Sequence, residues 1–317
     1  MSKPRVRLPF DIASVERSNL IPALEVVRGC LKTASMLWMH ALGLPVLSGV
    51  VVSNWSKGTA SVVRRFSTQQ RSSELLLRID KRNDRWTQRR GGYLISLSQI
   101  PTIIRELSRE GFIAALLEPA SPYADQYSLA GVTIPEQNRL VVEIVGPGFD
   151  ASDILRGDLQ AHERWELAIG TSRGAISGRQ IGLITAEEYT ESVRQRLAKI
   201  GARIRNPAFP DKAQKNATTP ELIDDAAAFL KKNRQTTLFR HSEIYIPIPE
   251  KYVSSFARLI TQLLMGLSGY GIHLGSSSFA ASVIPKRGLV FWDFFPARKQ
   301  ESASLYPAAQ VSRVHPR

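Results

Sequence analysis

Apolar residues along the chain fall mainly into short runs of strand length, separated by turns or by segments with helical periodicity. Runs of this length that are rich in β-branched and aromatic residues predict β-strands. The predicted strands cover residues 45–53, 74–80, 93–97, 112–118, 127–134, 139–146, 164–170, 175–183, 242–249, 278–284 and 288–295. The predicted helices cover residues 29–42, 101–111, 187–199, 219–234 and 252–265.

Three pairs of neighbouring strands are predicted to form hairpins. Residues 74–80 and 93–97 are joined by a long basic loop that ends at Gly91-Gly92, which favours a flexible hairpin. Residues 127–134 and 139–146 are joined by Pro-Glu-Gln-Asn, and residues 278–284 and 288–295 are joined by Pro-Lys-Arg-Gly. Helices connect several of the other predicted strands, and no internal repeat is visible. Hairpins mixed with helical crossovers predict the α+β class. Residues 205–220 are polar and contain prolines, which favours a connector without regular structure.

The formal net charge of +14 indicates affinity for anions, such as nucleotide phosphates, acidic metabolites or nucleic acid. The one dense basic run extends from Arg64 to Arg90, and it contains only two aromatic residues, Phe66 and Trp86. This is fewer than a base-stacking platform requires, which argues against nucleic acid as the main partner. A basic nucleic-acid-binding protein is retained as an alternative.

Cysteine content and hydropathy favour a cytoplasmic protein without a membrane segment. Cys30 is the single cysteine, which excludes an internal disulfide and fits a reducing compartment. Residues 33–53 carry no charged side chain, but Gly43, Pro45 and Gly49 interrupt them. A helix followed by a buried strand explains this segment better than a membrane span.

A series of short motifs resembles the N-terminal nucleotide-binding region of phosphoenolpyruvate synthase and pyruvate phosphate dikinase, a branch of the ATP-grasp superfamily. The resemblance covers roughly residues 28–160. It rests on features that occur in the family's order. They are Lys32 at the start of a helix, Gly43-Leu44-Pro45-Val46 before a strand, Arg78 near the end of a strand, the pair Gly91 and Gly92, Glu118 at the end of Phe-Ile-Ala-Ala-Leu-Leu-Glu, and the glycine loop after Val-Val-Glu-Ile-Val.

This resemblance implies two α+β lobes with a nucleotide between them. Residues 1–72 would form an N-terminal lobe, and residues 73–118 a small ATP-grasp lobe with its glycine loop. Residues 119–300 would form a C-terminal lobe with the acceptor site, followed by a tail at 301–317.

The resemblance also assigns the nucleotide contacts. Lys32 and Arg78 would neutralise phosphate oxygens, and the backbone of Gly91 and Gly92 would approach them closely. Glu118 would accept a hydrogen bond from the adenine amino group. From the residues alone, a solvent-facing lysine, a simple turn and an ordinary strand end remain open for Lys32, the glycine pair and Glu118.

The magnesium site is the part of the pattern that departs most from the family. Asp293 occupies the expected metal-ligand position on the last strand, and Glu143 is a second metal or ribose candidate, with Asp150 and Asp153 as further ones. The preceding strand carries Ala280, Ala281 and Ser282 where an acidic residue is expected. Because Asp293 lies in an apolar run, it requires a cation or an arginine partner, for which Arg298 is a candidate.

The resemblance therefore implies a stand-alone enzyme that uses ATP and magnesium to activate a small anionic acceptor. The reaction would form an acyl phosphate and then an amide, as in ligases, or would phosphorylate a small molecule as a kinase does. The dikinase reaction is not expected, since no histidine lies in a recognisable phosphohistidine context. The alternative from another class is a catalytically silent relative that binds nucleotide as a regulatory module.

Overall fold

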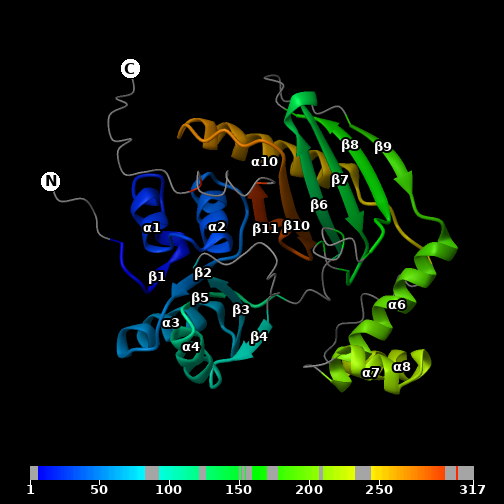
Figure 1. Ribbon diagram of the computed structural model, residues 1–317, viewed down its shortest axis with the longest axis horizontal. Helices are drawn as coiled ribbons and strands as arrows, with labels where there is room; N and C mark the ends of the chain where they lie inside the picture. Colours follow the sequence, from blue (N-terminus) through cyan, green and yellow to red (C-terminus); the bar gives the residue numbers. More distant parts are fainter. Residues whose placement is uncertain are drawn as a thin grey trace.

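The computed structural model describes residues 6–82, 93–120, 126–149, 151, 154, 159–169, 178–206, 210–232, 244–296 and 305. These residues form a mixed helical and sheet structure with two separate antiparallel sheets, which confirms the predicted α+β class (Figure 1).

The smaller sheet has five strands in the order β1-β2-β5-β3-β4. Its strands are β1 (Phe10–Asp11), β2 (Gly49–Val52), β3 (Glu74–Lys81), β4 (Tyr93–Ser96) and β5 (Phe112–Leu117). Helices α3 (Lys57–Gln70) and α4 (Ile100–Arg109) cover one face of this sheet. A 3₁₀ turn, η1 (Ile12–Ser14), follows β1. The boundary predicted at residue 72 falls between α3 and β3, within the stretch of chain that builds this sheet.

Alternation along β3 decides which side chains face the helices. Leu75, Leu77 and Ile79 pack into the cluster that α3 and α4 cover. Because successive side chains of a strand point to opposite faces, Arg78 and Asp80 point to the other face, toward the rest of the molecule.

The larger sheet has six strands in the order β11-β10-β6-β7-β8-β9, all paired antiparallel. Its strands are β6 (Tyr127–Ile134), β7 (Arg139–Val145), β8 (Glu163–Ala168), β9 (Gly178–Leu183), β10 (Ser277–Ile284) and β11 (Gly288–Pro296). All three predicted hairpins are confirmed as antiparallel pairs, β3 with β4, β6 with β7 and β10 with β11. The β6–β7 turn contains η3 (Pro135–Gln137) and Asn138 in a left-handed conformation.

Helix α10 (Glu250–Ser268) packs on one face of the larger sheet. Gly131 of β6 is required there, because a Cβ at this position would lie 2.7 Å from the Phe256 ring. Helices α1 (Leu20–Val26) and α2 (Leu31–Ala41) lie beside the smaller sheet, and α2 also contacts β11. One hydrophobic cluster joins residues of both sheets with α1, α2 and α10. The two sheets therefore share a core.

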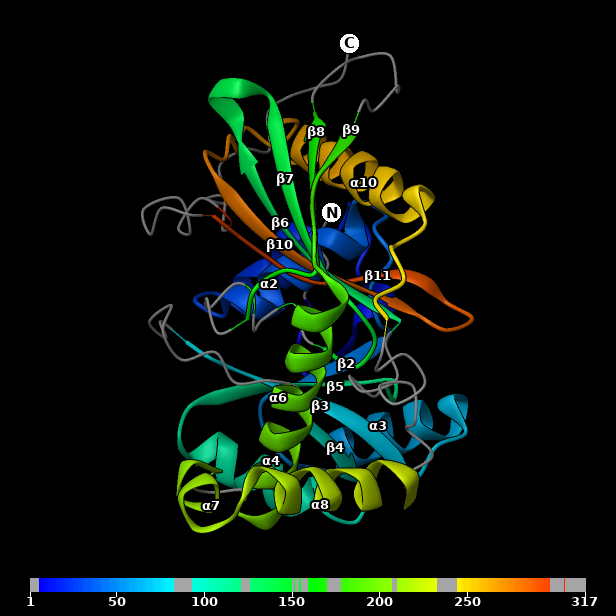
Figure 2. The ribbon, with the colours of Figure 1, turned by 90° about the vertical axis from the view of Figure 1, so that its right-hand side faces the viewer.

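Three helices extend from the larger sheet. Helix α6 (Ala186–Arg205) begins with a capping box formed by Thr185 and Glu188, and it ends beside α7 (Pro210–Asn216) and α8 (Thr219–Lys232). In Figures 1 and 2, α6 leads away from the larger sheet and places α7 and α8 at the level of the smaller one.

Two sequence predictions between residues 205 and 249 are wrong. The connector predicted at residues 205–220 contains helix α7, whereas the start of α8 agrees with the helix predicted from residue 219. The strand predicted at residues 242–249 is not one, because residues 244–249 have no strand pairing. Tyr245 is buried between the exposed Ile244 and Ile246, as in a strand, but Tyr245 Oη and the Ile248 N–H donate to the Glu163 side chain of β8 instead of pairing with a neighbouring strand.

Candidate functional site

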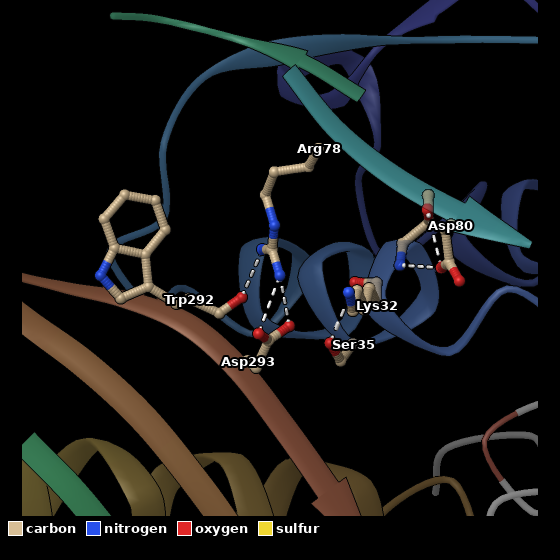
Figure 3. Close-up of polar contacts among 7 residues, drawn as sticks. Lys32, Ser35, Arg78, Asp80, Trp292 and Asp293 are labelled. Atoms are coloured by element: carbon tan, nitrogen blue, oxygen red, sulfur yellow. Dashed lines mark hydrogen bonds and ion pairs between the residues drawn. The ribbon is translucent and has the colours of Figure 1, made fainter. Parts of the chain in front are cut away.

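The two sheets are joined by a bidentate contact between Arg78 of β3 and the Trp292-Asp293 segment of β11. Arg78 Nη2 donates to Oδ1 and Oδ2 of Asp293 at 2.7 and 2.8 Å, and Arg78 Nη1 donates to the Trp292 carbonyl at 2.7 Å (Figure 3). The side chains are 11% and 18% exposed. The sequence correctly required a cationic partner for Asp293, although that partner is Arg78; Arg298 lies outside the described residues.

A bulge in β11 presents both acceptors to Arg78. Ala280 of β10 pairs with Asp293, whereas Ala281 pairs with Phe291, so Trp292 is the extra residue of β11. An extra residue disrupts the ladder locally and redirects its neighbours. The Trp292 indole Nε1 donates to Ser282 Oγ at 2.8 Å, and Ser282 lies 3.2 Å from Ser128 Oγ. These contacts fix the bulge on the sheet.

Lys32 lies in the first turn of α2, whose N-terminus is bound by Asp80 of β3. One Asp80 oxygen, Oδ2, accepts from the Thr33 backbone N–H at 2.9 Å and from Thr33 Oγ1 at 3.2 Å. Burial raises the pKa of the Asp80 carboxyl, while the Thr33 hydrogen bonds and the charges of Lys32 and Arg78 act in the opposite direction. Lys32 and Arg78 therefore both act electrostatically on one buried carboxylate, and Figure 3 shows all three along α2.

Glu118 links the end of β5 to two other parts of the chain. Its Oε1 accepts from the Ser48 backbone N–H at 3.0 Å and forms an ion pair with Arg287 at 2.5 Å. Arg287 lies in the turn between β10 and β11. The carboxylate therefore holds this hairpin against the smaller sheet, and its contact with adenine stays a prediction. Gly91 and Gly92 lie outside the described residues.

Glu143 and Asp293 lie in one row across the larger sheet, but far from each other. The register runs from Asp293 through Ala280 and Ala130 to Glu143, so the two acids are three strand spacings apart, about 14 Å. Glu143 instead pairs with Arg164 at 3.0 Å. A single ion cannot be bound by both carboxylates at this separation.

Within the described residues, no group of three or more His, Cys, Asp or Glu side chains is arranged to hold a metal ion. Asp150 and Asp153 lie outside those residues. Of the two proposed metal ligands, Asp293 is bound to Arg78 and Glu143 is paired with Arg164. A magnesium site built from Asp293 and Glu143 does not fit the structure.

Sequence reasoning missed a second polar centre, built around Glu163 at the start of β8. This carboxylate is 1% exposed. It accepts hydrogen bonds from Trp165 Nε1 at 2.5 Å, Gln180 Nε2 at 2.9 Å, Tyr245 Oη at 2.8 Å and the Ile248 N–H at 3.0 Å. With its oxygens satisfied by these donors, Glu163 anchors residues 244–249 to the sheet.

The neighbouring His162 is fully buried among Phe149, Tyr189 and Tyr245, with ring centroids 4.6 to 5.5 Å away. Its Nδ1 accepts from the Gly146 N–H at 3.0 Å, which places the ring proton on Nε2 when the imidazole is neutral. Burial lowers the pKa of His162 to about 3. The local sequence carries no signal for Glu163, because this residue is flanked by His162, Arg164 and Glu166 and resembles an ordinary polar stretch.

Two simpler predictions concern Cys30 and residues 33–53. Cys30 is buried, and burial raises the pKa of its thiol, as an inert structural cysteine requires. Across the described helices, none combines the length and apolar character needed to cross a bilayer. Residues 33–53 supply most of α2 and all of β2 instead.

No protein-family model and no curated protein matches the sequence. Several solved structures are similar in part. Macrocyclase MdnC of Microcystis aeruginosa MRC, bound with precursor peptide MdnA, has 9% identity and a TM-score of 0.34 over 86% of this chain and 58% of its own. D-alanyl-alanine synthetase A of Vibrio cholerae O1 biovar eltor has 9% identity and a TM-score of 0.41 over 90% of this chain and 60% of its own.

A third structure is a RiPP-associated ATP-grasp ligase of Chryseobacterium gregarium, in complex with ADP and a leader and core peptide. It has 8% identity and a TM-score of 0.35 over 91% of this chain and 60% of its own. The chain thus spans about three fifths of the length of these three proteins. At such TM-scores the similarity supports no argument about function, and the likeness to phosphoenolpyruvate synthase stays a prediction. The functional argument therefore rests on the geometry around Arg78.

Proposed function

We propose that the chain is an ATP-dependent ligase of the ATP-grasp type, which binds ATP between its two sheets and activates a carboxylate for attack by an amine. The observation that carries this proposal is the Arg78 guanidinium, which bridges the sheets and already binds an oxyanion through two oxygens. The planar guanidinium binds carboxylate and phosphate in the same bidentate way. Lys32 adds a second positive charge in the same region.

In the proposed reaction, an oxygen of the acceptor carboxylate attacks the γ-phosphorus of ATP, and the bond from phosphorus to the β–γ bridging oxygen breaks. The products are ADP and an acyl phosphate. The amine nitrogen then attacks the acyl carbon, inorganic phosphate leaves, the nitrogen releases a proton and an amide forms. Lys32 and Arg78 would stabilise the charge on the transferred phosphoryl group, so that positioning and charge neutralisation supply the catalysis.

The acceptor is proposed to be anionic, because the chain is strongly basic. Two basic residues of α6 are less available than the sequence suggests, since Arg194 pairs with Glu191 and Arg205 pairs with Asp225. Amino acids and peptides that carry a free carboxylate are the acceptors to test first. Direct phosphorylation of the acceptor would release ADP without forming an amide.

A catalytically silent nucleotide-binding module is the second candidate. One observation favours it. Asp293 is bound to Arg78, and its cross-strand neighbour is Ala280, at a position where the family resemblance expects a second acid. A silent module would bind ATP without turning it over. A nucleic-acid-binding protein, in contrast, would show salt-sensitive affinity for DNA or RNA that ATP does not reduce.

Thermal unfolding with ATP, with magnesium present or chelated, tests the proposal on wild type, Lys32→Ala and Arg78→Ala. A ligand that binds only the native state raises the midpoint. We expect ATP to raise the wild-type midpoint, and both variants to lose most of this rise. Arg179→Ala is the control, because this side chain is 75% exposed and pairs with Glu166, away from Arg78.

ADP release with candidate acceptors then separates the two candidate functions. Acceptor-dependent ADP release accompanied by an amide product supports the ligase, and binding without release supports the silent module. If millimolar ATP leaves the midpoint of folded wild type unchanged, the nucleotide site between the sheets is wrong.

A further inference from the structure

In this structure, the Arg78 guanidinium donates to a carboxylate of the same chain, Asp293. Nη2 donates to both oxygens of Asp293, at 2.7 and 2.8 Å, and arginine uses the same N–H donors for carboxylate and for phosphate oxygens. The side chains are 11% and 18% exposed, so the pair is partly accessible to solvent. An anion that binds Arg78 through this nitrogen must compete with the Asp293 carboxylate.

We propose that Asp293 is a built-in competitor for the phosphate site, which occupies Arg78 in the absence of nucleotide and is displaced when a polyphosphate binds. This inference rests on the proposed function, since it assumes that the triphosphate of ATP binds Arg78. It adds that Asp293, which the family resemblance assigns to the metal, competes with phosphate for Arg78.

The surroundings of the pair allow the Asp293 side chain to detach from Arg78 while β11 stays paired in the sheet. Arg78 keeps a second acceptor, the Trp292 carbonyl at 2.7 Å, so its side chain stays anchored to β11 during the exchange. The cross-strand neighbour of Asp293 is Ala280, whose methyl side chain has no donor that could hold the carboxylate in place. Trp292 is held independently through Ser282. The exchange therefore requires movement of one short side chain.

The competition has a direct consequence for affinity. In wild type, binding of a polyphosphate must break a charge-assisted hydrogen bond and must overcome repulsion from the released carboxylate. In Asp293→Asn, the side chain keeps its shape but loses its charge, and Arg78 becomes available. We expect this variant to bind ATP about tenfold more tightly than wild type in the presence of EDTA, because a charge-assisted hydrogen bond has roughly this strength.

Isothermal titration of ATP, inorganic tripolyphosphate and adenosine in EDTA tests the exchange. Asp293→Asn and Asp293→Ser should both bind ATP and tripolyphosphate more tightly than wild type, with no gain for adenosine, because the competition concerns phosphate alone. Adding Arg78→Ala to Asp293→Asn should abolish the gain. Glu166→Gln is the matched control, because Glu166 is 20% exposed and also forms ion pairs with arginines of the larger sheet.

The outcomes distinguish this inference from the proposed function. If wild type binds ATP and both Asp293 variants, folded by circular dichroism, bind it equally or more weakly, the competitor role is overturned and ATP binding stands. A different result is that the Asp293 variants bind tripolyphosphate more tightly than wild type does, while neither wild type nor any variant binds ATP more tightly than tripolyphosphate. In that case the competition stands and the nucleotide site is overturned. If no folded protein binds either polyphosphate, both are overturned.

Discussion

At the scale of single residues, burial of the His162 imidazole couples folding to protonation. The folded protein keeps this side chain neutral down to about pH 3, whereas the unfolded chain protonates it near pH 6.5. Between these values the unfolded state binds more protons, so stability is complete above pH 6.5 and is lost as the pH falls. From pH 6.5 to pH 5 the expected loss from this group is about 2 kcal/mol, at about 1.4 kcal/mol per pH unit.

Urea unfolding at pH 7.5 and pH 5 measures this effect when wild type is compared with His162→Asn. The asparagine Oδ1 can replace Nδ1 as acceptor for the Gly146 N–H, but the side chain does not titrate. The free energy of unfolding should fall by about 2 kcal/mol more in wild type than in the variant. Equal pH dependence in the two proteins would show that His162 is protonated in the folded state.

Single residues also show where sequence reasoning stops. The apolar neighbours of Asp293 require a positive partner, and this need was visible in the sequence. Nearness in sequence suggested Arg298, which lies outside the described residues, whereas the partner that the structure shows is Arg78, from a strand in the other sheet. That Asp293 requires a cationic partner follows from the local composition, whereas the identity of that partner depends on how the two sheets pack. The same limit applies to Glu163, whose donors come from β8, β9 and residues 245–248.

At the scale of elements, local patterns predicted most strands and helices, because their apolar periodicity is satisfied within each sheet or helix. The failure at residues 242–249 has a physical cause. Alternating burial arises there from anchoring to Glu163, and backbone pairing is not involved. Helix α7 was missed because its polar sequence, Pro-Asp-Lys-Ala-Gln-Lys-Asn, has little apolar periodicity, and its stability depends on contact with α6.

The crossing of α6 and α8 depends on one residue without a side chain. A Cβ at Gly201 of α6 would lie 1.8 Å from the Leu222 carbonyl oxygen of α8. Gly201→Ala must therefore push the helices apart, at a cost of about 1 to 3 kcal/mol. Gly58→Ala in α3 is the matched control, because the nearest atom to its Cβ would be 3.7 Å away.

Amide hydrogen exchange resolves this prediction by region. In Gly201→Ala, amides of α8 and of the second half of α6 should exchange faster, while those of β6 and β7 should keep their wild-type rates. Gly58→Ala should leave α6 and α8 unchanged. Wild-type protection in α8 of the Gly201 variant would mean that the helix crossing is looser than described.

At the scale of the whole molecule, the shared core predicts that the two sheets unfold together. Helix α2 lies between them. It contacts β11 of the larger sheet and β3 of the smaller one, and its Leu37 is fully buried in the cluster that contains residues of both sheets. Leu37→Ala removes contacts on which both sheets depend. The loss in free energy of unfolding should be about 2 to 5 kcal/mol, the usual range for this truncation.

Thermal unfolding followed by both tryptophan fluorescence and far-ultraviolet circular dichroism tests this cooperativity. Wild type and Leu37→Ala should each show one transition with coincident midpoints, shifted to lower temperature in the variant. Leu183→Ala serves as the control, because this residue of the edge strand β9 is 53% exposed and should leave the midpoint nearly unchanged. Two separate transitions, of which Leu37→Ala moves only one, would show that each sheet is stable alone. The Arg78–Asp293 contact would then join two independent domains, and polyphosphate binding would be free to change the angle between them.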